Sequence, residues 1–236
     1  NWSESDVATT VSIIGLQRIR LGRSRLREGA AMNHGGLAGR SKDRVFGDPI
    51  LIGILAFFVA HLVIRLFGTS NFSVDETMTA IHTQRFHLVY LLRNPPMFDW
   101  LYYGLSRVFG GGFLTMQLLK TALLGGGAVF FYLAIKPYFL HRAALAAAMA
   151  GYGATVFYGW EILQLYSHTN ALIFALGFTF WAFMRVVDRR RAFDYALLGV
   201  GLGFGLLSKY LFGLFFLSLV IAALTSSRFR EAMVSW

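Results

Sequence analysis

Long apolar runs separated by clusters of Lys and Arg dominate the chain, and this alternation restricts the folds open to it. Hydrophobic residues make up 56% of the 236 positions, whereas charged residues make up only 14%. A soluble domain of this size needs a larger polar fraction to cover its surface. We therefore predict an all-α fold, a polytopic bundle of transmembrane helices.

A helix that spans a membrane needs about 20 apolar residues to cross about 30 Å of hydrocarbon. The runs that qualify are Pro49 to Phe67, Phe113 to Ile135, Ala143 to Trp160, Thr169 to Val187 and Tyr195 to Leu224. The last run is too long for one span and short for two. A break near Ser208 and Lys209 would give six spans, whereas a single tilted helix ending on the far side is the competing interpretation.

Positive charge predicts the orientation, because Lys and Arg collect on the cytoplasmic side. With the basic N-terminal segment in the cytoplasm, six spans place every later basic cluster there too. These clusters contain Lys136, His141, Arg142, Arg185, Arg189, Arg190, Arg191, Arg228 and Arg230. The loop between the first two spans then lies on the non-cytoplasmic side.

Three regions differ in composition. Residues 1–48 are basic and rich in Gly and Ser, which predicts a disordered cytoplasmic segment, with Met32 as a candidate native start. Residues 49–225 form the transmembrane domain, and residues 226–236 a cytoplasmic loop at the point where a longer protein is truncated. The net charge of +10 comes from clumps between apolar runs, so no nucleic-acid partner is predicted.

Glycines recur inside two of the apolar runs. GVGLGFG, with Gly199, Gly201, Gly203 and Gly205, superficially matches a dinucleotide fingerprint. Because it lies inside an apolar helix, we interpret it as small-residue helix packing, and Gly125 to Gly127 likewise.

The loop after the first span contains the candidate chemistry. Ser73 and Glu76 fit the S-x-x-E capping box, which predicts a helix starting at Val74 and ending before Pro95 and Pro96. Its apolar positions recur at three- and four-residue steps, which is typical of an amphipathic helix on the outer leaflet. They are Val74, Met78, Ile81, Leu88 and Leu92.

The adjacent carboxylates Asp75 and Glu76 allow two interpretations. Glu76 caps the helix and Asp75 complements its dipole, or the pair performs chemistry at the membrane surface. Arg85 and Arg93 follow in the same segment, and cations beside an acidic pair suit a substrate that is both lipid and phosphate.

The order of these features resembles a known family. A first span is followed by DE, a PP with an aromatic run (NPPMFDWLYYGLSRVFG) and, later, GLGFGLLSKYLFGLFFL. This order is similar to the N-terminal half of polyprenyl-phosphate-sugar glycosyltransferases of the GT-C class, the group of protein O-mannosyltransferases and the aminoarabinose transferase of lipid A. The similarity covers Pro49 to Leu224.

The resemblance implies an inverting glycosyltransferase of a bacterial inner membrane, with a cytoplasmic N-terminus and a periplasmic active face. The donor would be a polyprenyl-phosphate-linked sugar, and the acceptor a hydroxyl of a lipid, glycan or protein, among membrane lipids. A divalent metal is left open, because Ser167, His168, Thr169 and Asn170 stand where relatives often carry an acidic residue.

The resemblance also implies roles for individual residues. Asp75 would be the general base, with Glu76 orienting the acceptor or capping the helix, and Pro95 and Pro96 would shape the cavity. Cations would hold the leaving phosphate: Arg85, Arg93, Lys120 and Lys209. A transporter or lipid flippase is the alternative function, although such proteins usually carry acidic residues within spans.

Overall fold

The computed structural model describes residues 48–68, 71–90, 94–157 and 167–234. The predictions for residues 1–47, with Met32, and for Arg93 lie outside the described residues. The chain divides into two units, Asn1–Asp48 and Pro49–Trp236, and the described helices belong to the second. They are α2 (Pro49–Gly68), α3 (Val74–His82), α4 (Met97–Phe109), α5 (Phe113–Ile135), η2 (Lys136–Tyr138), α6 (Arg142–Phe157), α8 (Ser167–Arg189), α9 (Ala192–Ser208), α10 (Phe212–Thr225) and α11 (Ser227–Val234).

All regular elements in the described part of the chain are helices, as predicted. Three of them are long and apolar enough to cross a membrane: Pro49–Gly68, Phe113–Tyr138 and Ser167–Arg189. Two shorter apolar helices follow, Ala192–Ser208 and Phe212–Thr225. The predicted third span coincides with α6, which has 16 residues.

The predicted break in the last apolar run is confirmed. Helix α9 ends at Ser208, and Lys209 has an extended backbone with φ −163° and ψ 141°. The chain then turns, and α10 begins at Phe212. Two short helices therefore replace the single tilted helix of the competing interpretation.

Helices α5 and α8 form the centre of the unit. Helix α5 packs against α2 and α8, and α8 packs against α9. The contact of α5 with α8 is close at Gly127 and Gly177, because a Cβ on Gly177 would collide with the carbonyl oxygen of Gly127. Small residues thus allow these backbones to approach, as predicted for Gly125 to Gly127.

The second glycine run is only partly used for packing. A Cβ on Gly201 would meet Thr179 of α8, and one on Gly205 would meet Phe212. Gly199 and Gly203 have open space beside them. The prediction of close packing therefore holds for two of these four glycines.

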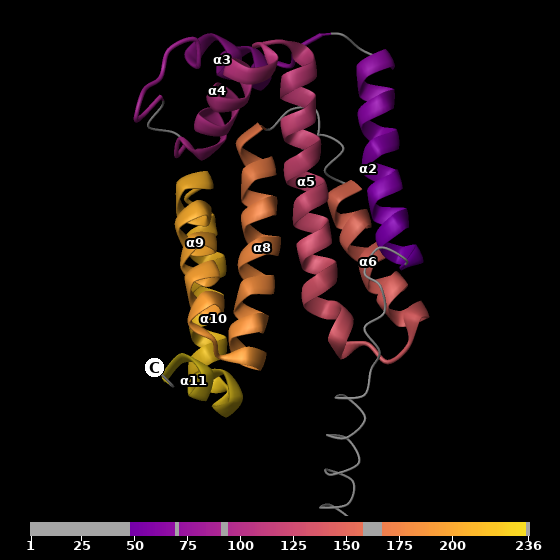
Figure 1. The fold of residues 1–236 in the computed structure, drawn as a ribbon, viewed down its shortest axis with the longest axis vertical. Helices are drawn as coiled ribbons and strands as arrows, with labels where there is room; N and C mark the ends of the chain where they lie inside the picture. The colour runs from indigo at the N-terminus through magenta and orange to yellow at the C-terminus, as the bar shows by residue number, and fades with distance from the viewer. Residues whose placement is uncertain (1–47, 69–70, 91–93, 158–166, 235–236) are drawn as a thin grey trace, which may run out of the picture. The chain divides into compact units, whose positions relative to one another are not determined.

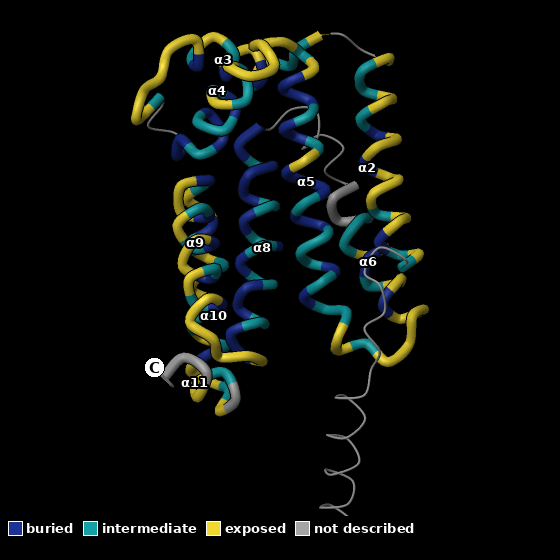
Figure 2. Tube along the Cα trace, in the orientation of Figure 1, coloured by how far each residue is buried: buried dark blue, intermediate teal, exposed yellow. Residues whose placement is uncertain are grey.

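The two ends of the unit carry different elements. Helices α3 and α4 lie over one end, next to the starts of α5 and α8, as Figure 1 shows. Clusters of basic residues lie at the other end, where α5 and α8 finish and α11 packs. Figure 2 shows α8 largely buried, whereas α2 is exposed along much of its length. The exposed residues of α2 are mostly apolar, as expected of a helix facing lipid.

The predicted helix after the first span is shorter than expected. Helix α3 ends at His82, and residues 83–90 form turns and bends. The prediction of a continuous helix that ends before Pro95 is therefore wrong. Short helices in proteins depend on packing for stability, and Leu88, which would have extended the apolar stripe, is 71% exposed. The chain instead forms a second helix, α4, directly after Pro96, in the aromatic run for which the sequence analysis made no prediction of secondary structure.

Beneath α4 lies an apolar cluster that holds it to the bundle. Phe98 and Tyr102 of α4 are buried against Met116 and Leu119 of α5 and Ala171 of α8. These contacts bring α4 and the segment before it over the first turn of α8.

Candidate active site

A capping box fixes the start of α3 and therefore the position of both carboxylates. The backbone N–H of Ser73 donates to Oε2 of Glu76 at 2.8 Å, and the N–H of Glu76 donates to Oγ of Ser73 at 3.4 Å. This predicted motif is confirmed. Because adjacent positions on a helix point in different directions, Asp75 and Glu76 face different surroundings.

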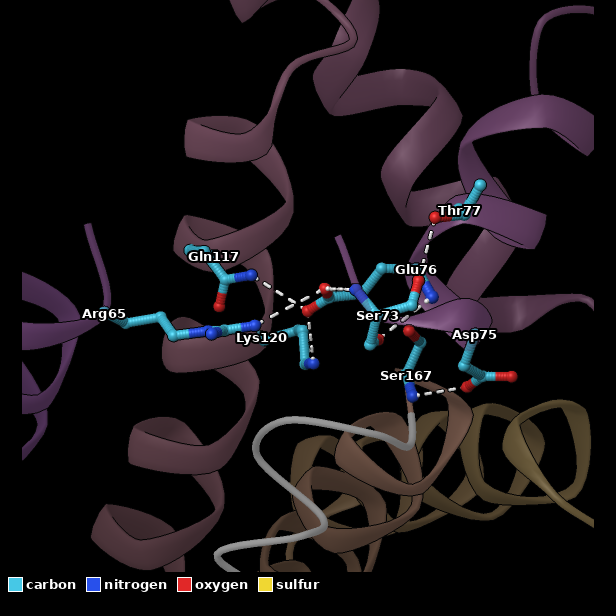
Figure 3. Close-up of polar contacts among 8 residues, drawn as sticks. All are labelled: Arg65, Ser73, Asp75, Glu76, Thr77, Gln117, Lys120 and Ser167. Atoms are coloured by element: carbon cyan, nitrogen blue, oxygen red, sulfur yellow. Dashed lines mark hydrogen bonds and ion pairs between the residues drawn. The ribbon is translucent and has the colours of Figure 1, made fainter. Parts of the chain in front are cut away.

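Glu76 is completely buried in a set of donors from two spans. Its Oε1 accepts hydrogen bonds from Nζ of Lys120 at 2.6 Å and from Nε2 of Gln117 at 2.8 Å. A guanidinium nitrogen of Arg65 lies 3.7 Å from Oε2. Figure 3 shows these side chains converging from α2 and α5 onto the start of α3.

The electrostatics of this cluster favour an ionised Glu76. Burial is the largest single effect and would raise the pKa of its carboxyl, but the charge and hydrogen bond of Lys120, together with the hydrogen bonds from Ser73 and Gln117, hold the pKa below its ordinary value. With both oxygens engaged by the protein, Glu76 tethers α3 to the bundle. Lys120, proposed from sequence as a phosphate ligand, is itself buried against this carboxylate.

Asp75 points to the other side of α3, toward the start of α8. Its Oδ2 accepts a hydrogen bond from the backbone N–H of Ser167 at 2.8 Å. The second oxygen points away from Ser167, as Figure 3 shows. The side chain is half-buried, so one carboxylate oxygen is anchored at a helix N-terminus while the other can meet a further group.

Lys209 reaches the same turn of α8. Its Nζ donates to Oγ1 of Thr169 at 3.0 Å, two residues after the N–H that holds Asp75. The structure therefore brings Asp75 and Lys209, predicted from distant parts of the sequence, to one helical turn.

The remaining predicted residues differ in position. Pro95 and Pro96 are buried directly before α4. Arg85 is exposed in the turns after α3; its carbonyl accepts from the hydroxyl of Tyr90, and no described residue forms an ion pair with its guanidinium. The structure does not bring Arg85 to Asp75.

A second acidic group lies close to Asp75 and was not predicted from the sequence. Asp99 of α4 is buried, and its Oδ1 lies 3.7 Å from Nε2 of His168. Burial and the charge of Asp75 together raise the pKa of Asp99 to about 7. Nothing in the local sequence pattern indicated this arrangement, because it requires α4 to pack over α8.

Arg65 and Gln117 were also missed, and Ser167 was considered only in connection with a metal. Arg65 offered a signal, since a charged residue inside an apolar run is functional or paired by default. Among the described residues, no group of three or more His, Cys, Asp or Glu is placed to hold a metal ion. We therefore derive no chemical step through a metal.

Two glycosyltransferases of known activity are similar to this chain. It is 27% identical over 183 residues to the lipopolysaccharide core galacturonosyltransferase RgtB of Rhizobium johnstonii, covering 78% of this chain and 37% of that protein. It is 29% identical over 187 residues to RgtA, the lipopolysaccharide core galacturonosyltransferase of the same organism, covering 78% of this chain and 36% of that protein. The chain thus spans little more than a third of the length of these relatives. No solved structure matches it.

The family comparison covers most of the chain. The sequence model of the dolichyl-phosphate-mannose-protein mannosyltransferases matches residues 93–235, from the segment before α4 through α11. The resemblance to GT-C glycosyltransferases is thereby confirmed, and the chain belongs to the dolichyl-phosphate-mannose-protein mannosyltransferase family.

Proposed function

We propose that this chain is the N-terminal part of an integral membrane glycosyltransferase that moves a sugar from a polyprenyl-phosphate donor to an acceptor hydroxyl. The family and the two relatives support sugar transfer. The observation that carries the proposal is Asp75, a half-buried carboxylate with one oxygen fixed by Ser167 and a cation, Lys209, on the same turn.

The proposed mechanism divides the work between these two residues. The free oxygen of Asp75 takes the proton of the acceptor hydroxyl as the hydroxyl oxygen attacks the anomeric carbon. The bond between the anomeric carbon and the phosphate oxygen breaks on the opposite face, which inverts the centre. Lys209 stabilises the phosphate as its charge grows, since a preplaced cation favours the transition state.

The other predicted residues receive different roles. Glu76 positions Asp75 by tethering α3, and Pro95 and Pro96 shape the segment before α4. Arg93, outside the described residues, and Arg85 stay candidates for the phosphate or for anionic lipid headgroups. Lys120 keeps its proposed role in the phosphate site only if a bound donor displaces it from Glu76.

The relatives narrow the proposed substrates. Both are named for transfer of galacturonic acid to the lipopolysaccharide core. We therefore propose a hexuronic acid as the donor sugar, a glycan of the outer leaflet as the acceptor, and a multi-pass protein of the bacterial inner membrane with a periplasmic active face.

The donor class is tested with the purified full-length protein. We expect transfer of galacturonic acid from polyprenyl-phosphate galacturonic acid to lipopolysaccharide core acceptor, with release of polyprenyl phosphate, and none from the corresponding nucleotide sugar. Both products are quantified by mass spectrometry. Transfer from the nucleotide sugar alone would contradict the proposal.

The orientation is tested by labelling, which the absence of cysteine in this chain makes simple. We expect cysteine at exposed Thr77, in α3, to react with a membrane-impermeant maleimide added to the periplasmic side. Cysteine at exposed Arg191, before α9, should react only after the membrane is permeabilised. Any cysteines elsewhere in the full-length protein are replaced first, and the reverse labelling pattern would exclude a periplasmic Asp75.

A further inference from the structure

A buried carboxyl and a buried imidazole meet directly beside the proposed base. Asp99 is 3% and His168 5% exposed, with 3.7 Å between Oδ1 and Nε2. The ring of Phe98 lies against the imidazole, with 5.7 Å between ring centroids. The imidazole also interacts with the backbone of Pro95, directly before α4. Two ionisable groups are costly to bury, and the proposed mechanism uses neither.

The pair is joined to Asp75 through the backbone. His168 follows Ser167, whose N–H donates to Asp75 at 2.8 Å. Contacts that hold the His168 ring therefore also hold the N–H group beneath the carboxylate. Asp99 supplies this contact from α4, a different element from the α3 that carries Asp75.

We infer that Asp99 and His168 form a positioning pair that holds the first turn of α8 under Asp75 and adds a second ionisation to this site. The catalytic part of this role rests on the proposed function, because it serves Asp75 as the base. The existence of the pair and of its proton does not depend on the proposed function, and both can be measured without substrate.

The charges around the pair set the direction of its titration. Burial comes first and the negative charge of Asp75 second in raising the pKa of Asp99 to about 7. His168 is affected first by burial, then by the charges of Asp75 from α3 and of Lys209 from the turn after α9, and by the backbone of Pro95 directly before α4. The charge of Asp99 also acts on Tyr90, in the turns after α3. Below about pH 7 Asp99 is neutral, and above it the carboxyl of Asp99 carries a negative charge.

Separation of two neighbouring carboxyls into one charged and one neutral form is a known route to distinct roles at one pH. Here the neutral form would be Asp99, and Asn has the same shape without the charge. Asp99→Asn should therefore preserve the fold and mimic the protonated state at every pH.

Infrared spectroscopy of the purified full-length protein in lipid nanodiscs tests the pair directly. At about one pH unit below 7 we expect an absorption band from a protonated, buried carboxyl. This band should disappear as the pH rises through 7. The band should be absent in Asp99→Asn and retained in Asp188→Asn, which removes an exposed carboxylate at the other end of α8. Survival of the band in Asp99→Asn, or no such band in the wild type, would overturn the inference.

Kinetics with the lipid-linked galacturonic acid donor test the positioning role. We expect the wild-type kcat to change with an inflection near pH 7, and Asp99→Asn to hold the rate of the wild-type low-pH form with no inflection there. An active wild type whose pH profile is unchanged in Asp99→Asn would overturn the positioning role. An inactive wild type would instead contradict the proposed function and leave the infrared result standing on its own.

Discussion

Replacing Asp75 by Asn in the full-length protein should lower kcat by about 10²- to 10⁴-fold, the usual contribution of a general base. The amide oxygen of Asn can still accept the hydrogen bond from Ser167 N–H that the structure records at 2.8 Å. The fold around α3 should therefore persist, because Ser73, Glu76 and Lys120 are untouched. What the amide cannot do is accept the proton of the acceptor hydroxyl.

The measurement compares kcat and the KM for the donor in the variant and the wild type, with thermal unfolding as a check on structure. The KM should change little, because Asp75 is proposed to act in the transition state and not in donor binding. Asp188→Asn is the matched control, since it removes an exposed carboxylate far from α3. A folded Asp75→Asn protein with wild-type kcat would remove Asp75 from the role of base.

The helical architecture could be predicted because its signals are local. Apolar runs and basic clusters predicted α2, α5 and α8, and the charges around the last run predicted the break that the structure places at Ser208 and Lys209. The capping box of Ser73 and Glu76 lies within four residues, so it too was visible in the sequence. Each of these features depends on neighbours in the chain.

The outer loop was harder to predict because its structure depends on packing. The apolar repeat through Leu88 favoured a long helix, yet the chain gains nothing by continuing one where Leu88 contacts solvent or lipid. Helix α4 forms instead because Phe98 and Tyr102 are buried against α5 and α8. Those partners lie far away in sequence, and the periodicity of the loop contains no information about them.

The candidate site was predicted as a set of residues but not as an arrangement. Asp75 and Lys209 were chosen separately, and in the structure both side chains form hydrogen bonds with the first turn of α8. Glu76 and Lys120 were also chosen as functional residues, but the structure pairs them with each other. Opposite charges removed from water attract strongly. A buried carboxylate therefore pairs with a buried Lys of the same bundle, and neither side chain is then available to a ligand.

This pairing predicts that Glu76→Gln destabilises the protein by about 3–5 kcal/mol, the usual effect of removing one partner of a buried ion pair. Lys120 is 1% exposed and would lose the carboxylate 2.6 Å away. The capping box and the tether of α3 would weaken at the same time. Thermal unfolding of the purified full-length protein in detergent should show the loss as a lower midpoint, and an unchanged midpoint would contradict it.

A second variant separates the lost charge pair from other effects of the substitution. In Glu76→Gln combined with Lys120→Met, the cation of Lys120 is no longer buried without its carboxylate, and an apolar replacement of a buried pair is often neutral or stabilising. The double variant should regain most of the lost stability, and a double variant as unstable as Glu76→Gln would contradict the buried-pair explanation.

The activity of the double variant then tests the role of Lys120. A folded double variant with near wild-type kcat makes Lys120 a structural partner of Glu76. A folded double variant that is much less active than folded Glu76→Gln alone supports a role of Lys120 at the donor phosphate, because the two proteins differ only in the charge at that position.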